Sequence, residues 1–284
     1  MTLLHPVDEK RCRTLARLDA TAKAQGLEIL LLGAFARDIL FWHSHGVECR
    51  RNTMDVDIVV QLKTWDAFHT FRTALLAVGF TDVTKNHPEK LRDTKTDVEI
   101  DLLPFGEIAE DGKTVVWPED NSRWSVVGIQ DAFAHALLIE IAVVGEPLKL
   151  RCVSAPALVL LKIVAVNDRP EARYKKDAAD IGFVIEQYLE IGNRSRLQIP
   201  PHDDILNKVD ADLNRATACL LGRDMSVMVS ASTKAHVVDL LSKEVASKSP
   251  CRFTQGLQRS LRSNKFAEAR TIVRDLLDGL KWRS

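Results

Sequence analysis

Apolar and polar residues follow two different periods along this chain, and the change of period divides it into two parts. In the first part, residues 27–33 and 54–60 form short runs rich in aliphatic and β-branched side chains. Such runs are typical of buried strands. Residues 97–103 alternate between apolar and polar side chains, which predicts a further strand that Pro104 ends.

Helices are predicted where apolar residues recur every three or four positions. Segments 8–23, 34–42, 65–78 and 129–138 have this spacing, and two more strands are expected at 139–144 and 148–153. The Asp111-Gly112 pair within a polar stretch is a hairpin turn signal. The first part therefore predicts a mixed β-sheet with flanking helices.

After Pro156 the helical spacing continues to the end of the chain with little strand signal. The segments that show it are 157–166, 175–189, 205–221, 233–246 and 266–280. We therefore predict an α+β fold in which residues 1–154 form an α/β core and residues 155–284 form a helical domain that completes a cleft.

The composition is that of a globular protein, with 46% hydrophobic and 27% charged residues among 284. Lys+Arg and Asp+Glu balance at 39 each, so a polyanion would have to bind a local basic patch. The five cysteines include no CxxC pair, which fits a reducing compartment better than a zinc site or a disulfide framework. With neither a signal-peptide core nor a membrane-length apolar run, we expect a cytoplasmic protein with no membrane partner.

Three aspartates suggest a metal site. Asp55 and Asp57 are two residues apart in a predicted strand, so their side chains point to the same face. Close carboxylates repel unless a cation lies between them, and oxygen ligands suit Mg²⁺ or Mn²⁺. If the strand that carries Asp101 is a neighbour, all three converge as a two-metal phosphoryl-transfer site requires. A solvated strand face is the alternative for an isolated Asp-x-Asp pair.

Gly33 stands between a predicted strand and a predicted helix. At such a turn, backbone N–H groups and the positive end of the helix dipole can bind a phosphate. The alternative is a glycine that only makes the turn. Neither signal is strong alone, but the order and spacing of this glycine and the aspartates together favour a site for a metal ion and a phosphate.

Four segments together resemble the nucleotidyltransferases related to DNA polymerase beta and, more closely, the bacterial AbiEii/AbiGii toxin-type nucleotidyltransferases. These segments are residues 32–38, 51–57, 98–106 and 156–180, within a resemblance that covers about residues 27–190. The resemblance implies a nucleotidyltransferase-type fold. It also implies that Asp55 and Asp57 hold both metal ions and that Asp101 completes the metal nearer the acceptor.

The same resemblance implies a nucleotide site. Gly33 and Ala34 would cradle the β- and γ-phosphates, although Ala34 stands where the family usually has a serine. Lys162 would neutralise charge on the leaving pyrophosphate, and Asp177 would orient that lysine or touch the nucleotide. Arg37 would reach a phosphate or pair with the neighbouring Asp38.

The resemblance therefore implies a Mg²⁺- or Mn²⁺-dependent enzyme that transfers a nucleoside monophosphate from an NTP to an acceptor hydroxyl and releases pyrophosphate. The resemblance favours RNA as the acceptor, in particular the tRNA 3′ end, in a toxin that an antitoxin protein restrains. A small-molecule acceptor such as an antibiotic is the enzymatic alternative. A second alternative is a non-catalytic nucleotide-binding module, which only Ala34 supports.

The sequence suggests further residues whose role is structural or functional. Basic residues are concentrated near the C-terminus and could hold an RNA backbone or form a solvated helix face: Lys248, Arg252, Arg259, Arg262, Lys265, Arg270, Arg274, Lys281 and Arg283. His135 is expected in the core, Glu99 at the rim of the site or as a fourth carboxylate, and Trp117, Trp124 and Trp282 in packing or in base stacking. The spacing of His43, His45 and Cys49 fits no standard zinc site.

Overall fold

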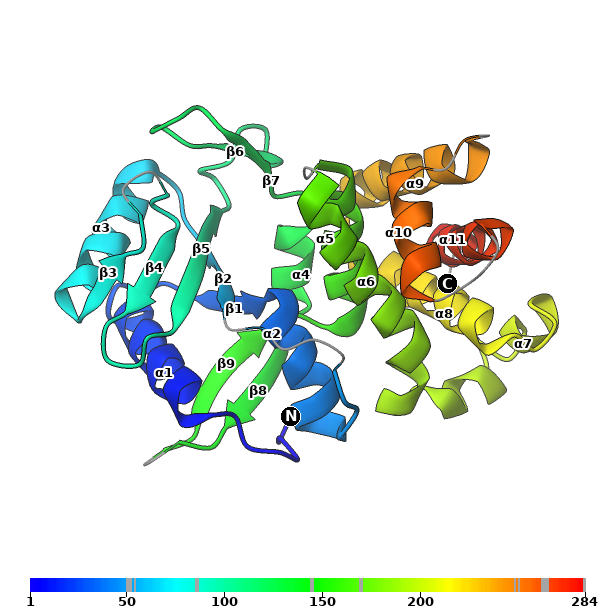
Figure 1. The fold of residues 1–284 in the computed structure, drawn as a ribbon, viewed down its shortest axis with the longest axis horizontal. Coiled ribbons are helices and arrows are strands. Elements are labelled where there is room, and N and C mark those ends of the chain that lie inside the picture. The colour runs from blue at the N-terminus through cyan, green and yellow to red at the C-terminus, as the bar shows by residue number, and fades with distance from the viewer. Residues whose placement is uncertain are drawn as a thin grey trace. The chain divides into compact units, whose positions relative to one another are not determined.

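The computed structural model describes residues 1–49, 53, 55–84, 87–143, 146–168, 171–247, 249, 251–261 and 266–282. They form two compact units, Met1–Ser154 and Ala155–Ser284, and each is described by itself (Figure 1). Within the described residues, the first unit contains all the strands and the second is helical. This arrangement confirms the predicted α+β class, a mixed sheet with flanking helices followed by helices.

The first unit is built on a seven-stranded sheet with the order β3-β4-β5-β2-β1-β9-β8. Parallel pairs (β1/β9 and β2/β5) and antiparallel pairs both occur, so the sheet is mixed. Its strands are β1 (Ile29–Leu32), β2 (Val56–Gln61), β3 (Phe80–Asp82), β4 (Lys90–Asp93), β5 (Glu99–Phe105), β8 (Leu137–Ile141) and β9 (Leu148–Cys152). A separate two-stranded sheet pairs β6 (Thr114–Val116) with β7 (Arg123–Ser125).

The central strands form where the sequence is most aliphatic. Val59 and Leu30 are fully buried and pair with each other across β1 and β2. The predicted end of β5 was wrong, because the strand continues through Pro104 to Phe105. Pro104 is tolerated because β4 pairs only with residues 99–101 of β5, so the proline's missing N–H breaks no ladder bond on that side.

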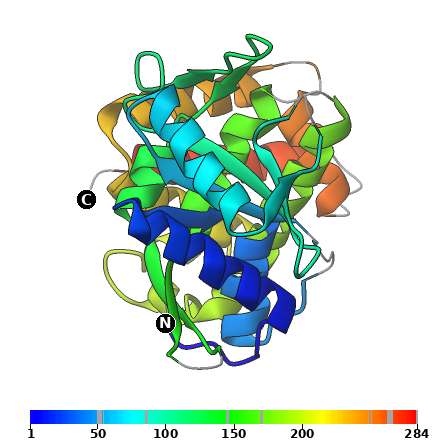
Figure 2. The same cartoon turned by 90° about the vertical axis from the view of Figure 1, so that its left-hand side faces the viewer.

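In the part of the first unit that the structure describes, four α-helices accompany this sheet: α1 (Glu9–Ala24), α2 (Gly33–Asp38), α3 (Trp65–Ala77) and α4 (Ile129–Ala134), with a π-helical turn Ile39–His43 after α2. The side chains of Asp8 and Thr64 cap α1 and α3 by accepting backbone N–H bonds. Helices α1 and α3 lie side by side over one face of the sheet (Figure 2). The Asp111-Gly112 turn forms as predicted, with both residues at positive φ.

Two expectations around α4 were wrong. The helix ends at Ala134 instead of residue 138, and β8 begins at Leu137. His135 is exposed instead of buried, and its Nδ1 lies 3.0 Å from the carbonyl oxygen of Asp131. The short helix ends here because Leu137–Ile141 pairs with β9 as an edge strand. The apolar residues of this segment also fit a helical period, so the sequence alone did not show where the helix stops.

The second unit contains seven α-helices within its described residues. They are α5 (Ala155–Asp168), α6 (Glu171–Gln187), α7 (Ile205–Lys208), α8 (Leu213–Met228), α9 (Ala231–Ala246), α10 (Arg252–Ser260) and α11 (Phe266–Lys281), with 3-10 turns at Tyr188–Ile191 and Arg194–Gln198. The single helix predicted over 205–221 was wrong. Asp210 and Ala211 have positive φ, which interrupts the helix, and Asp212 then caps α8.

Close backbone approach joins α8 to α11. A Cβ on Gly222 would lie 2.3 Å from the carbonyl oxygen of Leu276, and one on Gly279 would lie 2.1 Å from that of Cys219. Only glycine fits at either position, so these two residues set the distance between the helices. None of the helices in the described part of the chain is long and apolar enough to cross a membrane.

Candidate active site

The predicted site residues Asp57 and Asp101 lie where β2 and β5 run side by side in the first unit. These strands are parallel neighbours, as the convergence of the aspartates requires, and Asp57 is in register with Asp101. Asp57 is also in register with Leu32, the last residue of β1. Adjacent strands lie about 4.8 Å apart, so one rung of the sheet brings Asp101, Asp57 and the start of α2 together.

Gly33 lies against the carboxyl group of Asp57. Its φ is +77°, in the left-handed region that glycine adopts without steric cost. A Cβ built on Gly33 would lie 1.8 Å from Asp57 Oδ2 and 2.5 Å from Asp57 Cγ. The glycine therefore does more than turn the chain, because it leaves the space that the Asp57 carboxyl group fills.

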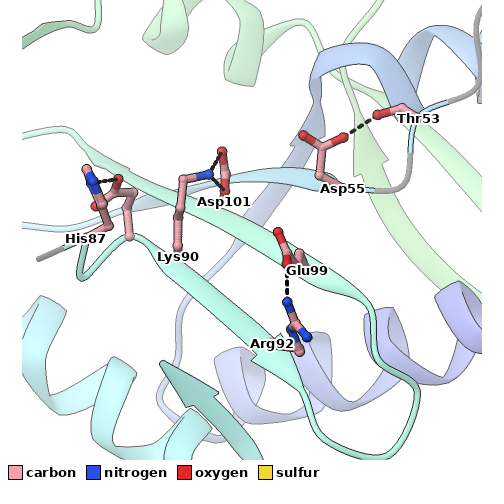
Figure 3. Close-up of polar contacts among 8 residues, drawn as sticks. Thr53, Asp55, His87, Lys90, Arg92, Glu99 and Asp101 are labelled. Carbon is pink, nitrogen blue, oxygen red and sulfur yellow. Dashed lines mark hydrogen bonds and ion pairs between the residues drawn. The ribbon is translucent and has the colours of Figure 1, made fainter. Parts of the chain in front are cut away.

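Asp55 precedes the first residue of β2 and is exposed. The hydroxyl of Thr53 donates a hydrogen bond to Asp55 Oδ1 (Figure 3). Thr53 is itself held from α1, because the Arg11 guanidinium donates to the Thr53 carbonyl oxygen. Arg11 in turn pairs with the capping residue Asp8 at 3.0 Å and lies over the Phe35 ring, with Cζ 4.7 Å from the ring centroid. The start of α1 thus positions the residue that orients Asp55.

Each acidic residue on this face of β5 has a basic partner on β4 (Figure 3). Lys90 is opposite Asp101 in the antiparallel ladder, and its Nζ lies 2.8 and 3.0 Å from the two carboxylate oxygens. Arg92 is opposite Glu99 and pairs with it at 2.5 Å. Glu99 therefore forms an ion pair at the rim of the site, and the rim was one of the two locations predicted for it.

The arrangement of these carboxylates tests whether the residues fit a metal ion. Among the residues that the structure describes, no three His, Cys, Asp or Glu side chains are placed to share a metal ion. The backbone register nevertheless sets Asp57 beside Asp101, and the ammonium of Lys90 occupies a cation's position at Asp101. Carboxylate oxygens are the hard donors that Mg²⁺ prefers, so the chemistry of the donor set fits this ion. The assignment of the metal to Asp55, Asp57 and Asp101 stays a prediction.

Two other predicted nucleotide residues are in α2. Ala34 is buried, directly after Gly33. Arg37 is buried too, and its Nε and Nη2 donate to Asp38 Oδ1 at 2.9 and 2.5 Å. Pairing with Asp38 was one of the two readings of Arg37. The parts that Ala34 and Arg37 would take in nucleotide binding stay predictions.

A cavity of about 1020 Å³ opens beside Asp55. Its walls come from the start of α1, from the π-helical turn and from the start of β5, and they include Arg11, Trp42, Thr53 and Glu99. Ligand sites for small molecules typically enclose about 300–1000 Å³. The cavity is therefore large enough to hold a small organic molecule next to a predicted catalytic residue.

The second unit contains the predicted pair Lys162 and Asp177, together with a partner that the sequence did not suggest. Lys162 Nζ lies 3.0 Å from Asp177 Oδ1 and 2.7 Å from Asp180 Oδ2, and all three residues are buried. Burial alone would lower the pKa of Lys162, but the charges of Asp180 and Asp177 outweigh it and the pKa is raised. Lys162 is therefore held as a buried cation, and its contact with pyrophosphate stays a prediction.

The aromatic, histidine and cysteine residues that were considered for base stacking or metal binding have structural contacts. Trp117 is buried in an aromatic cluster with Trp65, Phe68 and Trp124, and Trp282 lies 5.9 Å from the His202 ring. Burial lowers the pKa of His43 and raises that of Cys49 to about 12. Such a thiol resists the deprotonation that metal binding requires.

The basic residues near the C-terminus are partly used in packing. Arg252 Cζ lies 5.7 Å from the Tyr174 ring centroid, and Arg270 Cζ lies 4.8 Å from that of Phe266. Arg274 and Lys281 are exposed on α11, and Arg259 is exposed on α10. Lys248, Arg262, Lys265 and Arg283 lie outside the described residues, as does Arg51 of the segment 51–57.

Sequence reasoning missed Lys90 and the strand β4 that carries it. The signal was present as a symmetric pattern of charge. Lys90 and Arg92 precede a short polar turn, and Glu99 and Asp101 follow it at equal distances, so a hairpin centred on residues 95–96 pairs each base with an acid. Cross-strand pairs of opposite charge are a recognised stabiliser of such ladders.

The chain is similar to three solved structures of two proteins, an antibiotic-resistance factor and a tRNA-processing enzyme. The solution structure of the antibiotic-resistance factor ANT(2'')-Ia aligns at 16% identity and a TM-score of 0.38, covering 67% of this chain and 94% of that one. ANT(2'')-Ia in complex with adenylyl-2''-tobramycin gives 16% identity and a TM-score of 0.37, covering 66% and 98%. A tRNA-processing enzyme in an apo form aligns at 11% identity and a TM-score of 0.28, covering 98% of this chain and 91% of that one.

None of these TM-scores is high enough to carry an argument about activity or substrate. No protein-family model and no curated protein matches the chain. The resemblance to the AbiEii/AbiGii toxin-type nucleotidyltransferases therefore stays a prediction from the sequence segments that carry it.

Proposed function

We propose that this protein is a metal-dependent nucleotidyltransferase that transfers a nucleoside monophosphate from an NTP to an acceptor hydroxyl. The single observation that carries the proposal is the register of the sheet, which sets Asp57 beside Asp101 and against Gly33. A glycine at a strand-to-helix turn and carboxylates on the adjoining rung are the parts that a site for Mg²⁺ and phosphate needs.

Each residue has a separate part in this reaction. Asp55 and Asp57 would hold Mg²⁺ together with the phosphates of the NTP, and Asp101 would complete the metal site nearer the acceptor. The backbone N–H groups of Gly33 and Ala34 donate to the phosphate oxygens. A bound Mg²⁺ supplies charge neutralisation at the phosphates and a lower pKa for the attacking hydroxyl. Thr53 and Arg11 keep Asp55 in place through the contacts described above.

The transfer step conserves all atoms and charge. The acceptor oxygen forms a bond to the α-phosphorus, and the bond from that phosphorus to the oxygen bridging to the β-phosphate breaks. Asp101 accepts the hydroxyl proton, and pyrophosphate leaves. Lys162 is proposed to neutralise charge on the leaving pyrophosphate, with Asp177 orienting its ammonium group at 3.0 Å.

RNA is the acceptor that we propose, with the tRNA 3′ end as the preferred position and an antitoxin protein as the physiological partner. The support is the resemblance carried by the four sequence segments and the exposed basic residues of α10 and α11, among them Arg259, Arg274 and Lys281. Lys and Arg side chains on an exposed helix face can bind phosphates by displacing counterions.

Transfer to a small molecule is the second candidate, and the cavity beside Asp55 favours it. The volume of about 1020 Å³ suits an acceptor of the size of a nucleoside or an amino sugar. Acidic side chains outnumber basic ones among the residues that line the cavity, and this excess would attract a cationic acceptor. A hydroxyl on a molecule bound there would lie next to a predicted metal ligand.

The test is label transfer from each α-³²P nucleoside triphosphate with Mg²⁺, offered total RNA in one arm and a panel of small hydroxyl compounds in the other. Asp57→Asn and Asp101→Asn keep the side-chain shape and should reduce transfer at least about 100-fold. Glu140→Gln, which removes a surface carboxylate of β8 that pairs with Lys149 at 3.4 Å, is the matched control. Label in the RNA identifies the proposed acceptor, and label in a small molecule identifies the second candidate. Turnover of either aspartate variant at the wild-type rate would contradict the site.

A further inference from the structure

Lys90 has a contact with Asp101 that differs from an ordinary surface ion pair. Its Nζ lies nearly equidistant from both carboxylate oxygens, at 2.8 and 3.0 Å. Both side chains are half-buried, with 28% and 32% of their surface exposed. The lysine reaches Asp101 from the opposing residue of β4, so the strand pairing fixes where the ammonium lies (Figure 3).

Asp101 therefore has a neighbour of opposite charge on one side and a neighbour of like charge on the other. Lys90 of β4 faces it across one ladder, and Asp57 of β2 is in register across the other. A divalent ion that bridged Asp57 and Asp101 would have to approach the same carboxylate oxygens that Lys90 contacts. Two cations at one carboxylate repel each other, so they compete for it.

We propose that Lys90 is a positioning residue that holds Asp101 and competes with the divalent cation for it. This inference rests on the proposed function and deepens it by assigning a regulator of metal loading. With Lys90 in place, the free enzyme binds the metal alone weakly. An NTP brings its own negative phosphates, which offset the charge of Lys90, so the metal binds together with the nucleotide.

The geometry also supplies a matched control. Arg92 is two residues from Lys90 on the same strand and the same face, and its partner is Glu99 instead of a predicted metal ligand. Arg92→Met removes one positive charge from the same ladder. It leaves the Lys90–Asp101 contact in place, so it separates a general change of charge from a specific change at Asp101.

The experiment measures Mn²⁺ binding to the full-length protein without nucleotide, by the electron paramagnetic resonance signal of free Mn²⁺ at one pH. Lys90→Met should bind Mn²⁺ roughly tenfold more tightly than the wild type, the order expected for losing a unit charge at contact distance near a surface. Lys90→Arg, which keeps the charge, and Arg92→Met should bind as the wild type does. In Lys90→Met combined with Asp57→Asn, the gain should disappear.

Three results would overturn the proposal: unchanged or weaker binding in Lys90→Met, an equal gain in Arg92→Met, or a gain that survives Asp57→Asn. A fluorescence melting curve of each variant establishes that it is folded, and Lys90→Gln carries the test if the methionine variant does not fold. Failure here leaves the proposed function standing if the wild type transfers label and Asp57→Asn does not. Absence of transfer in the wild type would instead count against the function itself.

Discussion

Replacement of Gly33 by alanine tests the contact at the centre of the site. The new Cβ would lie 1.8 Å from Asp57 Oδ2, 2.5 Å from Cγ and 2.8 Å from Cβ of the same residue. Asp57 is held by pairing with both β1 and β5, so its backbone cannot simply withdraw. We therefore expect the carboxyl group to leave its position, because its side-chain torsion is the softest coordinate available.

The size of the effect has two parts. The first is backbone strain, because an L-residue at the φ of +77° found here costs about 1–2 kcal/mol. The second is displacement, because the carboxylate oxygen must move by more than about 1 Å to restore van der Waals contact. A misplacement of about 1 Å in a catalytic group costs on the order of 100-fold in rate.

Gly26 provides a control with the same strain and no displaced neighbour. Its φ is +68°, and a Cβ there would meet nothing within 4 Å. Gly26→Ala should lose about 1–2 kcal/mol of unfolding free energy in urea and keep its rate of nucleotide transfer. Gly33→Ala should lose at least as much stability and, in addition, about 100-fold in rate.

A double-mutant cycle tests the same contact without an activity assay. Asp57→Ala removes Oδ2 and Cγ, the two atoms nearest the new Cβ, so Gly33→Ala should cost less stability in that background. Additive costs, within about 0.5 kcal/mol, would refute the reasoning. Transfer by Gly33→Ala at the wild-type rate would do so as well.

Two further predictions concern buried charges. Lys162→Met removes the ammonium shared by Asp177 and Asp180 and should cost about 3–5 kcal/mol of unfolding free energy at pH 7. The pKa of Lys162 is raised above 10.5, so the stabilisation by its charge is present below that pH and is lost as the pH rises through the folded-state pKa. The difference in unfolding free energy between the wild type and the methionine variant should therefore narrow only in strong alkali. Burial alone would raise the pKa of Asp93, but hydrogen bonds from Arg17 and Thr14 outweigh burial and hold the pKa below 3.8. The ionised Asp93 should therefore stabilise the fold above that pH, and this contribution should be lost in acid. Urea unfolding of Asp93→Asn from pH 7 to pH 2 should therefore show a smaller acid-induced loss than the wild type does.

The central part of the fold could be predicted because its strands and helices have strong periodic patterns. The β2 segment is aliphatic and alternates, so its strand and the direction of its aspartates follow from the sequence alone. The pairing of β2 with β5 does not follow in the same way. It depends on contacts between segments about 40 residues apart, which local periodicity does not encode.

The strand β4 was missed because three of its four residues are charged. Leu91 is its single apolar side chain and is fully buried, so the strand has no hydrophobic run to recognise. Its stability comes from cross-strand pairs such as Lys90–Asp101. The α7–α8 break was missed for another reason, since Asp210 and Ala211 adopt positive φ without a glycine to signal it.

Charge balance explains how the sheet accommodates its carboxylates before a metal is considered. Asp57 and Asp101 lie on neighbouring strands about 4.8 Å apart and repel each other unless positive charge is close. Lys90 supplies such a charge to Asp101. Asp55 is exposed, contacts the uncharged hydroxyl of Thr53, and forms no ion pair with any residue that the structure describes. The fold therefore tolerates Asp101 without a bound ion because Lys90 pairs with it, and a divalent cation at the proposed site would neutralise the charge that Asp55 keeps.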